Sequence, residues 1–346
     1  MLSIFPNATQ EQLPYDIEVL QARMSEILLT GIPELDQIIT YLLAEPGKML
    51  RPRLVYLAAS LYPSDHDIVQ DAAVAIELIH LASLVHDDVI DGSALRRGRD
   101  SLNSLWGSKA SVLVGDYLFA TAFRLINQHN IPAILETVTR TIQTMCSGEI
   151  QQLSSTFNLN LSLSDYLQRI YCKTACLFEC CCRVGALASS MPSQQRDSLE
   201  KYGASLGIAY QIIDDVLDFL STTKYLGKPA GSDLLEGNIT LPVIYGLQDE
   251  NCQKDLKEIL NQPVNLAGQL DRVTQILQRC GAFEKSIQLA DAYLADARAS
   301  LKSLPEAGRR SLCSLSQALS SDYLQRMTSL SVLDGFAYQF YEPEPV

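Results

Sequence analysis

Residues 71–91 read DAAVAIELIHLASLVHDDVID, and this stretch decides the fold. Apolar residues occupy nearly every side of a helix drawn through it, and a helix that is apolar all round is buried in a protein core. The stretch ends in the aspartates Asp87, Asp88 and Asp91, directly before Gly92, a residue type that commonly terminates helices. The sequence therefore predicts a core helix with three carboxylates at its C-terminal end.

The remainder of the chain also favours helices. Similar helix-forming runs occupy residues 164–191, 199–220 and 271–304, and proline and glycine residues separate the runs. Alternation of apolar and polar residues with a period of two is nearly absent, so little or no sheet is expected. No solenoid-length repeat and no low-complexity linker divides the 346 residues. These features predict an all-α fold with a single domain over residues 1–329 and a tail over residues 330–346.

Charge and composition argue against several classes of protein. The net charge of −13 disfavours nucleic acid as a partner and disfavours binding to anionic lipid through charge alone. No run of about eighteen consecutive apolar residues occurs, and residues 1–12 lack a basic segment followed by an apolar one, so neither a transmembrane helix nor a signal peptide is expected. The nine cysteines include no CxxC pair and are typical of packing residues in a reducing compartment. The expected location is the cytoplasm.

A second aspartate cluster repeats the spacing of the first. The clusters read DDVID over residues 87–91 and DDVLD over residues 214–218, so both have the form DDxxD. On a helix the first and fifth positions lie one above the other, so the outer two aspartates of each cluster are expected to project together. Paired carboxylates of this kind suit Mg²⁺. The alternative is a solvated acidic surface, which is disfavoured because each cluster ends an apolar run and because carboxylates at a helix C-terminus are unfavourable without a cation.

Basic residues suited to phosphate groups stand near these clusters. Lys48 and Arg51 are three residues apart, and the arginine pair at 96–97 closely follows the first aspartate cluster. Guanidinium groups match phosphate oxygens in a bidentate manner. His80 lies two helical turns before Asp87 on nearly the same face, so it either donates to the same ligand or is a hydrogen-bonded core histidine. Each basic group alone is more often a solvated surface feature, and only their association with the aspartates favours an anionic substrate.

Six segments together resemble the trans-isoprenyl diphosphate synthases, and look most like the long-chain bacterial branch that includes the catalytic component of heptaprenyl diphosphate synthase. The segments are GKMLRP, ELIHLASLVHDDVIDGSALRRG, GDYLFA, KTA, YQIIDDVLDF and LGKPAGSDLLEGNITLP. The resemblance runs from about Ile38 to Leu330, and the tail beyond has no counterpart in it. Met49 stands where Arg or Lys is frequent and Ser101 where Thr is usual, but neither departure removes a catalytic group.

The resemblance implies a bundle of mostly antiparallel helices around a deep central cavity, and a dependence on Mg²⁺ with three ions when substrate is bound. The implied metal ligands are Asp87, Asp91 and Asp214. The implied catalytic set is Asp87, Asp88, Asp91, Asp214, Asp215, Asp218 and Lys173. The implied isopentenyl diphosphate site contains Lys48, Arg51, His80 and Arg97. The implied allylic diphosphate site contains Arg96, Lys173, Thr174, Gln211 and Lys228.

The reaction implied by the resemblance is the successive 1′-4 condensation of isopentenyl diphosphate with an allylic diphosphate, such as farnesyl or geranylgeranyl diphosphate, to a long-chain trans-polyprenyl diphosphate. One alternative is a short-chain geranylgeranyl diphosphate synthase. Another is a class I terpene cyclase, which usually lacks the GKxLRP segment and the second DDxxD in this form. A third is a non-catalytic partner subunit, which tends to lose the aspartates kept here. A homodimer is expected, while an active subunit that requires a small non-catalytic partner stays open.

Two small residues bear on product length. Ala82 and Ser83 lie five and four residues before Asp87, roughly one helical turn, ~5.4 Å, from the aspartates. Short-chain relatives in the family often carry aromatic side chains here, so the small pair implies an open path for a growing chain and products beyond twenty carbons, about thirty to fifty. The alternative is that small residues merely allow two helices to pack closely.

Overall fold

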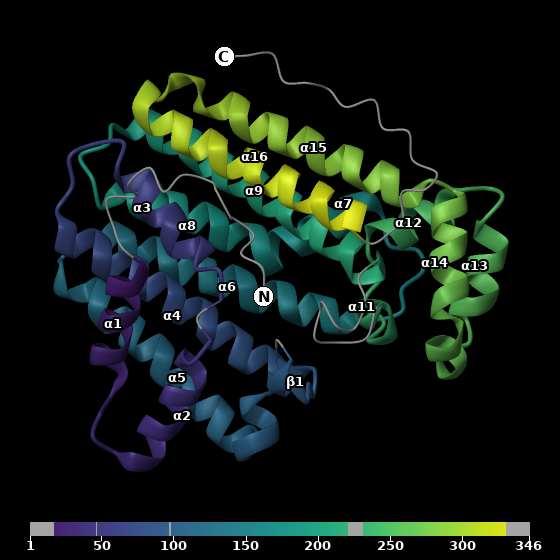
Figure 1. Ribbon diagram of the computed structural model, residues 1–346, viewed down its shortest axis with the longest axis horizontal. Coiled ribbons are helices and arrows are strands. Elements are labelled where there is room, and N and C mark those ends of the chain that lie inside the picture. Colours follow the sequence, from purple (N-terminus) through teal and green to yellow (C-terminus); the bar gives the residue numbers. More distant parts are fainter. Residues whose placement is uncertain (1–16, 46, 97, 221–230, 330–346) are drawn as a thin grey trace.

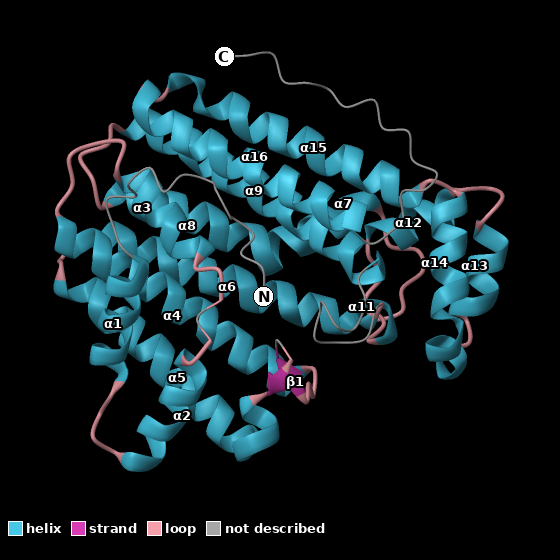
Figure 2. Ribbon diagram, viewed as in Figure 1, coloured by secondary structure: helices cyan, strands magenta, loops and turns pink. Residues whose placement is uncertain are grey.

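The computed structural model describes residues 17–45, 47–96, 98–220 and 231–329. Within these ranges the regular structure is almost entirely helical, and the sheet is one short two-stranded hairpin (Figure 2). The prediction of an all-α fold is therefore confirmed. The predicted tail lies outside the described residues.

The elements follow one another in a simple order. The first helices are α1 (Ile17–Leu28), α2 (Pro33–Leu43), α3 (Leu50–Ala59) and α4 (His66–Ile90). The hairpin consists of the antiparallel strands β1 (Leu95–Arg96) and β2 (Arg99–Asp100). The central elements are α5 (Leu102–Gln128), α6 (Pro132–Ser154), α7 (Leu163–Ile170), the π-helix η1 (Tyr171–Ala175), α8 (Cys176–Leu187) and α9 (Ser193–Leu220).

The C-terminal third completes the bundle. Its elements are α11 (Ser232–Leu235), α12 (Leu241–Gln248), α13 (Gln253–Leu260), the 3₁₀ helix η2 (Pro263–Gln269), α14 (Leu270–Arg279), α15 (Ala282–Ser300), the 3₁₀ helix η3 (Leu301–Ser303) and α16 (Glu306–Ser329). The long helices α9, α15 and α16 run side by side, while α13 and α14 stand at one end of the molecule (Figure 1).

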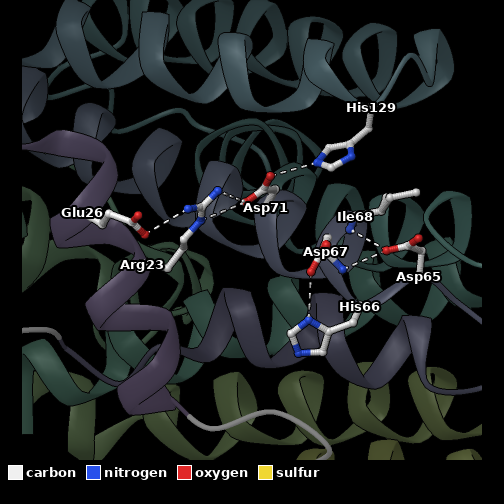
Figure 3. A network of polar contacts seen from close by, with 8 residues as sticks. All are labelled: Arg23, Glu26, Asp65, His66, Asp67, Ile68, Asp71 and His129. Atoms are coloured by element: carbon white, nitrogen blue, oxygen red, sulfur yellow. Dashed lines mark hydrogen bonds and ion pairs between the residues drawn. The ribbon is translucent and has the colours of Figure 1, made fainter.

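The helix α4 is the predicted core helix. It packs against α3 and α5, and Asp65 caps its N-terminus by accepting a hydrogen bond from the amide of Asp67 at 2.9 Å (Figure 3). Among the described helices α4 alone is long and apolar enough to cross a membrane, but 72% of its most apolar window is buried inside the protein. The apolar surface of α4 is thus used for packing within the bundle.

A buried carboxylate attaches two other helices to the first half of α4. Asp71 is 5% exposed, and its Oδ1 accepts hydrogen bonds from Nε and Nη2 of Arg23 on α1, both at 3.3 Å (Figure 3). Its Oδ2 lies 2.9 Å from Nε2 of His129, the C-cap residue of α5. A carboxylate removed from water needs such partners. The network therefore fixes α1 and the end of α5 onto α4, about 24 Å along the helix axis from Asp87.

One predicted helix is interrupted. The run over residues 271–304 divides into α14 and α15, because Gly281 adopts a left-handed conformation with φ of 65° that a helix interior does not contain. An isolated glycine in a helical pattern either continues the helix or ends it, so the pattern alone did not locate this break. The run over residues 164–191 follows the predicted path but contains the wider π turn of η1.

Two glycines allow α9 to approach α8 and η1 closely. A Cβ atom on Gly207 would lie 2.6 Å from the Cα of Ala175, and one on Gly203 would lie 2.7 Å from the carbonyl oxygen of Phe178. Cβ atoms essentially never come so near, so a larger residue at either position would push the helices apart. Gln211 lies one turn after Gly207, and the close contact therefore brings it beside Thr174 of η1.

Candidate active site

The end of α4 places its three aspartates in two environments. Gly92, with φ of 62°, closes the helix as predicted, and the amide of Ser93 bonds to the carbonyl oxygen of Asp88 at 3.0 Å, a Schellman arrangement. The Asp88 side chain is buried, and its Oδ1 accepts hydrogen bonds from Nε of Arg96 at 2.8 Å and from Nη2 of Arg96 at 2.5 Å. Asp87 is half-buried and Asp91 is exposed. The outer two aspartates therefore stay accessible, while the middle one holds an arginine of the hairpin.

Carboxylates from three other elements surround Lys173 of η1. Burial lowers the pKa of Lys173, but the charges of Glu149, Asp87, Asp91 and Asp233 outweigh burial and raise that pKa above its ordinary value. The Nζ atom lies 3.8 Å from Oε2 of Glu149. The C-terminal end of α4, the second half of α6, the π turn and α11 thus meet around one ammonium group. A π turn commonly marks a functional position in a helix.

The surplus of negative charge around Lys173 fits a cation. Burial raises the pKa of Asp87, Lys173 opposes this rise, and the charges of Glu149 and Asp91 support it, so that the pKa lies at about 6. Among the described residues, no group of three or more His, Cys, Asp or Glu side chains is placed to hold a metal ion. Mg²⁺ usually keeps several waters or substrate phosphates among its six oxygen ligands, so a pair of carboxylates one helical turn apart is a suitable partial site.

The raised pKa of Asp87 predicts a pH-dependent affinity for Mg²⁺. With a pKa of about 6, the ionised fraction falls from about nine-tenths at pH 7 to about a quarter at pH 5.5, so apparent affinity should fall about fourfold. Calorimetric titration of wild type with Mg²⁺ and inorganic diphosphate checks this. The variant Asp87→Asn should lack the part of this pH dependence that comes from Asp87. An unchanged affinity of wild type for Mg²⁺ between pH 7 and pH 5.5 would contradict the prediction.

The raised pKa of Asp87 also makes the stability of the metal-free fold depend on pH. The metal-free folded state takes up a proton on Asp87 more readily than the unfolded chain, in which the pKa is 3.8. The favourable contribution of this group is therefore fully present below about pH 4 and is lost as the pH rises through about 6. The charged carboxylate is a cost to the fold that a bound cation would offset.

In the second cluster, Asp214 is exposed, whereas Asp218 is 3% exposed and has its own partners. The Oδ1 of Asp218 accepts a hydrogen bond from the Ser232 hydroxyl at 2.9 Å, and its Oδ2 accepts one from the backbone amide of Asp233 at 3.2 Å. Asp214 and Asp218 share a face of α9 by their spacing, but Asp214 is open to solvent and Asp218 is not. Asp218 fixes the start of α11 instead, and so places Asp233 near Lys173.

Asp215 is also buried. Its carboxylate accepts hydrogen bonds from the hydroxyl of Tyr166 at 2.7 Å and from Nε2 of Gln211 at 2.8 Å. Burial raises the pKa of Asp215, the charge of Asp233 adds to this, and the two donors oppose it. Asp215 consequently serves the interior of the site rather than its open face.

A basic site lies at the start of α3. Nη1 of Arg51 lies 2.9 Å from Nε2 of His80, and its guanidinium lies over the ring of Phe178, 5.2 Å from the ring centroid. The buried Nε of Arg51 has no hydrogen-bond partner among the described residues. Lys48 is exposed two residues before the first turn of α3. A helix N-terminus with an available guanidinium donor beside it favours a phosphate group.

The comparison with known proteins identifies the family. A sequence model described as Polyprenyl synthetase matches residues 32–277. The chain belongs to the polyprenyl synthetase family. The predicted family is thus confirmed, and the protein is an enzyme of the prenyltransferase class.

The relatives of this synthase include proteins that make long chains. Heptaprenyl diphosphate synthase component 2 of Bacillus subtilis (strain 168) is 36% identical over 296 residues, which cover 86% of this chain and 84% of that protein. A crystal structure of heptaprenyl diphosphate synthase from Staphylococcus aureus matches with a TM-score of 0.84 and 32% identity, over 90% of this chain and 98% of that one. A crystal structure of a polyprenyl synthase from Caulobacter crescentus CB15, complexed with calcium and isoprenyl diphosphate, matches with a TM-score of 0.83 and 34% identity. The match covers 88% of this chain and 94% of that one.

The remaining sequence-predicted residues of the synthase fall into three groups. Thr174 and Gln211 are brought together, with Oγ1 of the threonine donating to Oε1 of the glutamine at 2.6 Å. Ala82 is fully buried on α4. The half-buried Ser83 donates a hydrogen bond from its hydroxyl to the carbonyl oxygen of His80 on the same helix, at 2.8 Å. Arg97 and Lys228 lie outside the described residues.

Sequence reasoning missed three residues of the synthase site. Glu149 and Asp233 contribute charge beside Lys173, and Tyr166 donates to the second aspartate cluster. Asp233 stands within LGKPAGSDLLEGNITLP, one of the segments that carry the family resemblance, and that position was an available signal. Glu149 and Tyr166 lie on ordinary amphipathic helices, where no spacing distinguished them from surface and core residues.

Proposed function

We propose that the protein is a Mg²⁺-dependent trans-polyprenyl diphosphate synthase that adds isopentenyl diphosphate repeatedly to an allylic diphosphate. The observation that carries the proposal is the meeting of Asp87 and Asp91, from the first DDxxD cluster, with Glu149 and Asp233 around Lys173. A separate basic site is formed by Arg51 and His80. Two sites for anions, of which one is rich in carboxylates, are what two diphosphate substrates and metal ions require. A cytoplasmic location is part of the same proposal.

Each group has a defined task in this proposal. Asp87, Asp91 and Asp214 would hold Mg²⁺, and Lys173 would donate to oxygens of the allylic diphosphate. Mg²⁺ supplies positive charge that stabilises the departing diphosphate. The side chains of this chain orient the substrate and preorganise the charge, a contribution that is commonly the largest in catalysis. Arg51 would hold isopentenyl diphosphate through its guanidinium group, whose buried Nε has no hydrogen-bond partner among the described residues.

The bonds that change all lie within the substrates. The allylic C1–O bond breaks, diphosphate leaves, and C4 of isopentenyl diphosphate forms a bond to C1. A proton is then lost from C2, and the released diphosphate is its acceptor by family analogy. No side chain is required as a nucleophile, which agrees with the absence of a Ser-His-Asp or Cys-His constellation among the predicted site residues.

The product is proposed to exceed twenty carbons. The relatives from Bacillus subtilis and Staphylococcus aureus are both named heptaprenyl diphosphate synthases, and small residues at positions 82 and 83 agree with a long product. The test is incubation of the purified protein with Mg²⁺, isopentenyl diphosphate and farnesyl diphosphate, with product length read by chromatography. Products that stop at twenty carbons would identify a short-chain synthase, and conversion of farnesyl diphosphate alone would identify a terpene cyclase.

We further propose that the chain works as a dimer with a second copy of itself. Among the described residues, α5 and α6 carry several large apolar side chains exposed to solvent, and an apolar surface of this kind favours association. These residues are Leu105, Val112, Leu113, Ile150 and Leu153. The name "component 2" of the relative from Bacillus subtilis keeps an unlike partner subunit as the alternative.

Light scattering of the purified protein is expected to give about twice the chain mass of 38.2 kDa. Leu113→Asp should shift the mass toward that of one chain, because it places a charge in the apolar surface. The control Val264→Asp, at an exposed valine on η2, should not. A fully active single chain would refute dimerisation, whereas a protein inactive until a second, unlike subunit is added would replace the homodimer with a heterodimer.

A further inference from the structure

A chain of hydrogen bonds links the interior of α7 to the accessible part of the site. The hydroxyl of Tyr166, a fully buried residue, donates to Oδ2 of Asp215 at 2.7 Å. The other carboxylate oxygen of Asp215, Oδ1, accepts a hydrogen bond from Nε2 of Gln211 at 2.8 Å. Oε1 of Gln211 in turn accepts a hydrogen bond from the hydroxyl of Thr174 at 2.6 Å. The chain crosses from α7 to α9 and then to η1, beside Lys173.

The structure gives the direction of each bond in this chain. Nε2 of Gln211 donates to Oδ1 of Asp215, so the side-chain amide of Gln211 turns its NH₂ group toward Asp215. Its carbonyl oxygen then faces Thr174, and the single proton of the Thr174 hydroxyl is committed to it. What Thr174 offers to a bound molecule is therefore the lone pairs of its oxygen. A rotated hydroxyl would offer a donor instead, which is a different interaction with the substrate.

Tyr166 is itself held in place. The guanidinium of Arg169 lies over its ring, 5.6 Å from the ring centroid, and Nη2 of Arg169 donates to the carbonyl oxygen of Ile239. The close approach of Gly207 to Ala175 keeps α9 and η1 at a fixed separation. The tyrosine hydroxyl is thus aimed at Asp215 by packing on both sides, and the glutamine has little freedom to turn over.

We infer that Tyr166 is a positioning residue for prenyl transfer: its hydroxyl orients the Asp215 carboxylate, which through Gln211 sets the direction of the Thr174 hydroxyl in the allylic site. The inference rests on the proposed function. It differs from a role in packing, because a packing role belongs to the ring of Tyr166, whereas this role belongs to its hydroxyl and extends across three elements of the fold.

The variant Tyr166→Phe tests the inference, because it keeps the ring and removes the donor. The expected result is a fall in kcat of about 10- to 100-fold, as the loss of a hydrogen bond to a buried polar group implies, with KM for isopentenyl diphosphate unchanged within about twofold. The matched control is Tyr171→Phe. The hydroxyl of Tyr171 donates to Oε2 of Glu179 at 2.9 Å, a tyrosine–carboxylate bond that takes no part in the chain. The control should keep both kinetic constants within about twofold.

Two further measurements separate positioning from structural damage. In a Thr174→Val background, where the chain already lacks its last member, Tyr166→Phe should cause little additional loss of kcat. Calorimetry with a non-reacting thio-diphosphate analogue of farnesyl diphosphate and Mg²⁺ should show binding weakened about fivefold or more in Tyr166→Phe and unchanged in Tyr171→Phe.

The outcomes distinguish this inference from the proposed function. Equal kinetic changes in Tyr166→Phe and Tyr171→Phe, or losses of Tyr166→Phe and Thr174→Val that simply multiply, would overturn the positioning role and leave the proposed function intact. A wild-type protein that forms no product from isopentenyl and farnesyl diphosphates would refute the proposed function, on which the inference rests. Wild-type kinetics in Tyr166→Phe would refute the inference alone.

Discussion

Replacement of Asp87 or Asp214 by asparagine is expected to lower turnover at least ~1,000-fold, because each substitution removes a charge that we propose holds metal at the departing diphosphate. The melting temperature should change little. Asp214 is exposed, and the ionised Asp87 is costly to the metal-free fold because burial raises its pKa to about 6. At pH 7.5, Asp87→Asn should therefore be at least as stable as wild type. Rate and melting temperature are measured on the same preparations.

The control for these variants is Asp197→Asn. Asp197 is an exposed aspartate on α9, the helix that carries Asp214, and it stands four to five turns before the second cluster. This variant should retain wild-type turnover, so that loss of activity in Asp214→Asn reflects position rather than charge. Near-normal turnover in either Asp87→Asn or Asp214→Asn would remove the proposal of a metal site formed by both clusters.

The two DDxxD clusters have the same spacing but are used in different ways. In the first, the middle aspartate holds Arg96, and both outer aspartates stay accessible. In the second, only Asp214 is exposed, while Asp215 and Asp218 hold Gln211 and the start of α11. The difference arises because α9 is enclosed by neighbouring elements as far as its last turn. Half of the carboxylates thus act on protein groups, and the accessible half is the part suited to ions.

The sequence was sufficient for the parts of the fold that depend on periodicity. The core position of α4 and its end at Gly92 follow from an apolar pattern and a glycine, and the structure has both. The break at Gly281 did not follow, because the tertiary position of α15 decides whether that glycine ends a helix. The π turn of η1 did not follow either, since it differs from an α-helix by one residue per turn and leaves no mark in the apolar pattern.

The site shows a similar limit. Helical spacing indicates which side chains share a face, but not what occupies the space opposite that face. Asp218 shares a face with Asp214 by spacing, yet its Oδ1 accepts a hydrogen bond from the hydroxyl of Ser232, which lies on another element. Glu149 reaches Lys173 only because α6 lies beside η1, a contact that no local pattern encodes. Residues whose roles depend on a neighbour from far along the chain were the ones that the sequence alone did not reveal.

Ala82→Phe is expected to shorten the product to about fifteen to twenty carbons, a rough estimate from one helical turn per isoprene unit. Wild type should exceed twenty carbons, because nothing bulky stands one turn from Asp87 on the path proposed for the growing chain. The structure adds a constraint, since Ala82 is fully buried and a phenyl ring there must displace its neighbours. A loss of stability of about 1–3 kcal/mol is expected in addition. Product length, rate and melting temperature are measured together.

The destabilisation alone does not distinguish a blocked path from a disturbed core, and Ala73→Phe provides that distinction. Ala73 is equally buried on α4 but stands nine residues earlier, about 180° around the helix from Ala82. If small residues on α4 serve only close packing, both variants should lose stability alike and neither should change product length. If the chain grows past Ala82, only Ala82→Phe shortens the product while Ala73→Phe keeps the wild-type length. An Ala82→Phe protein that folds, turns over and still makes the wild-type product would show that the path does not pass this residue.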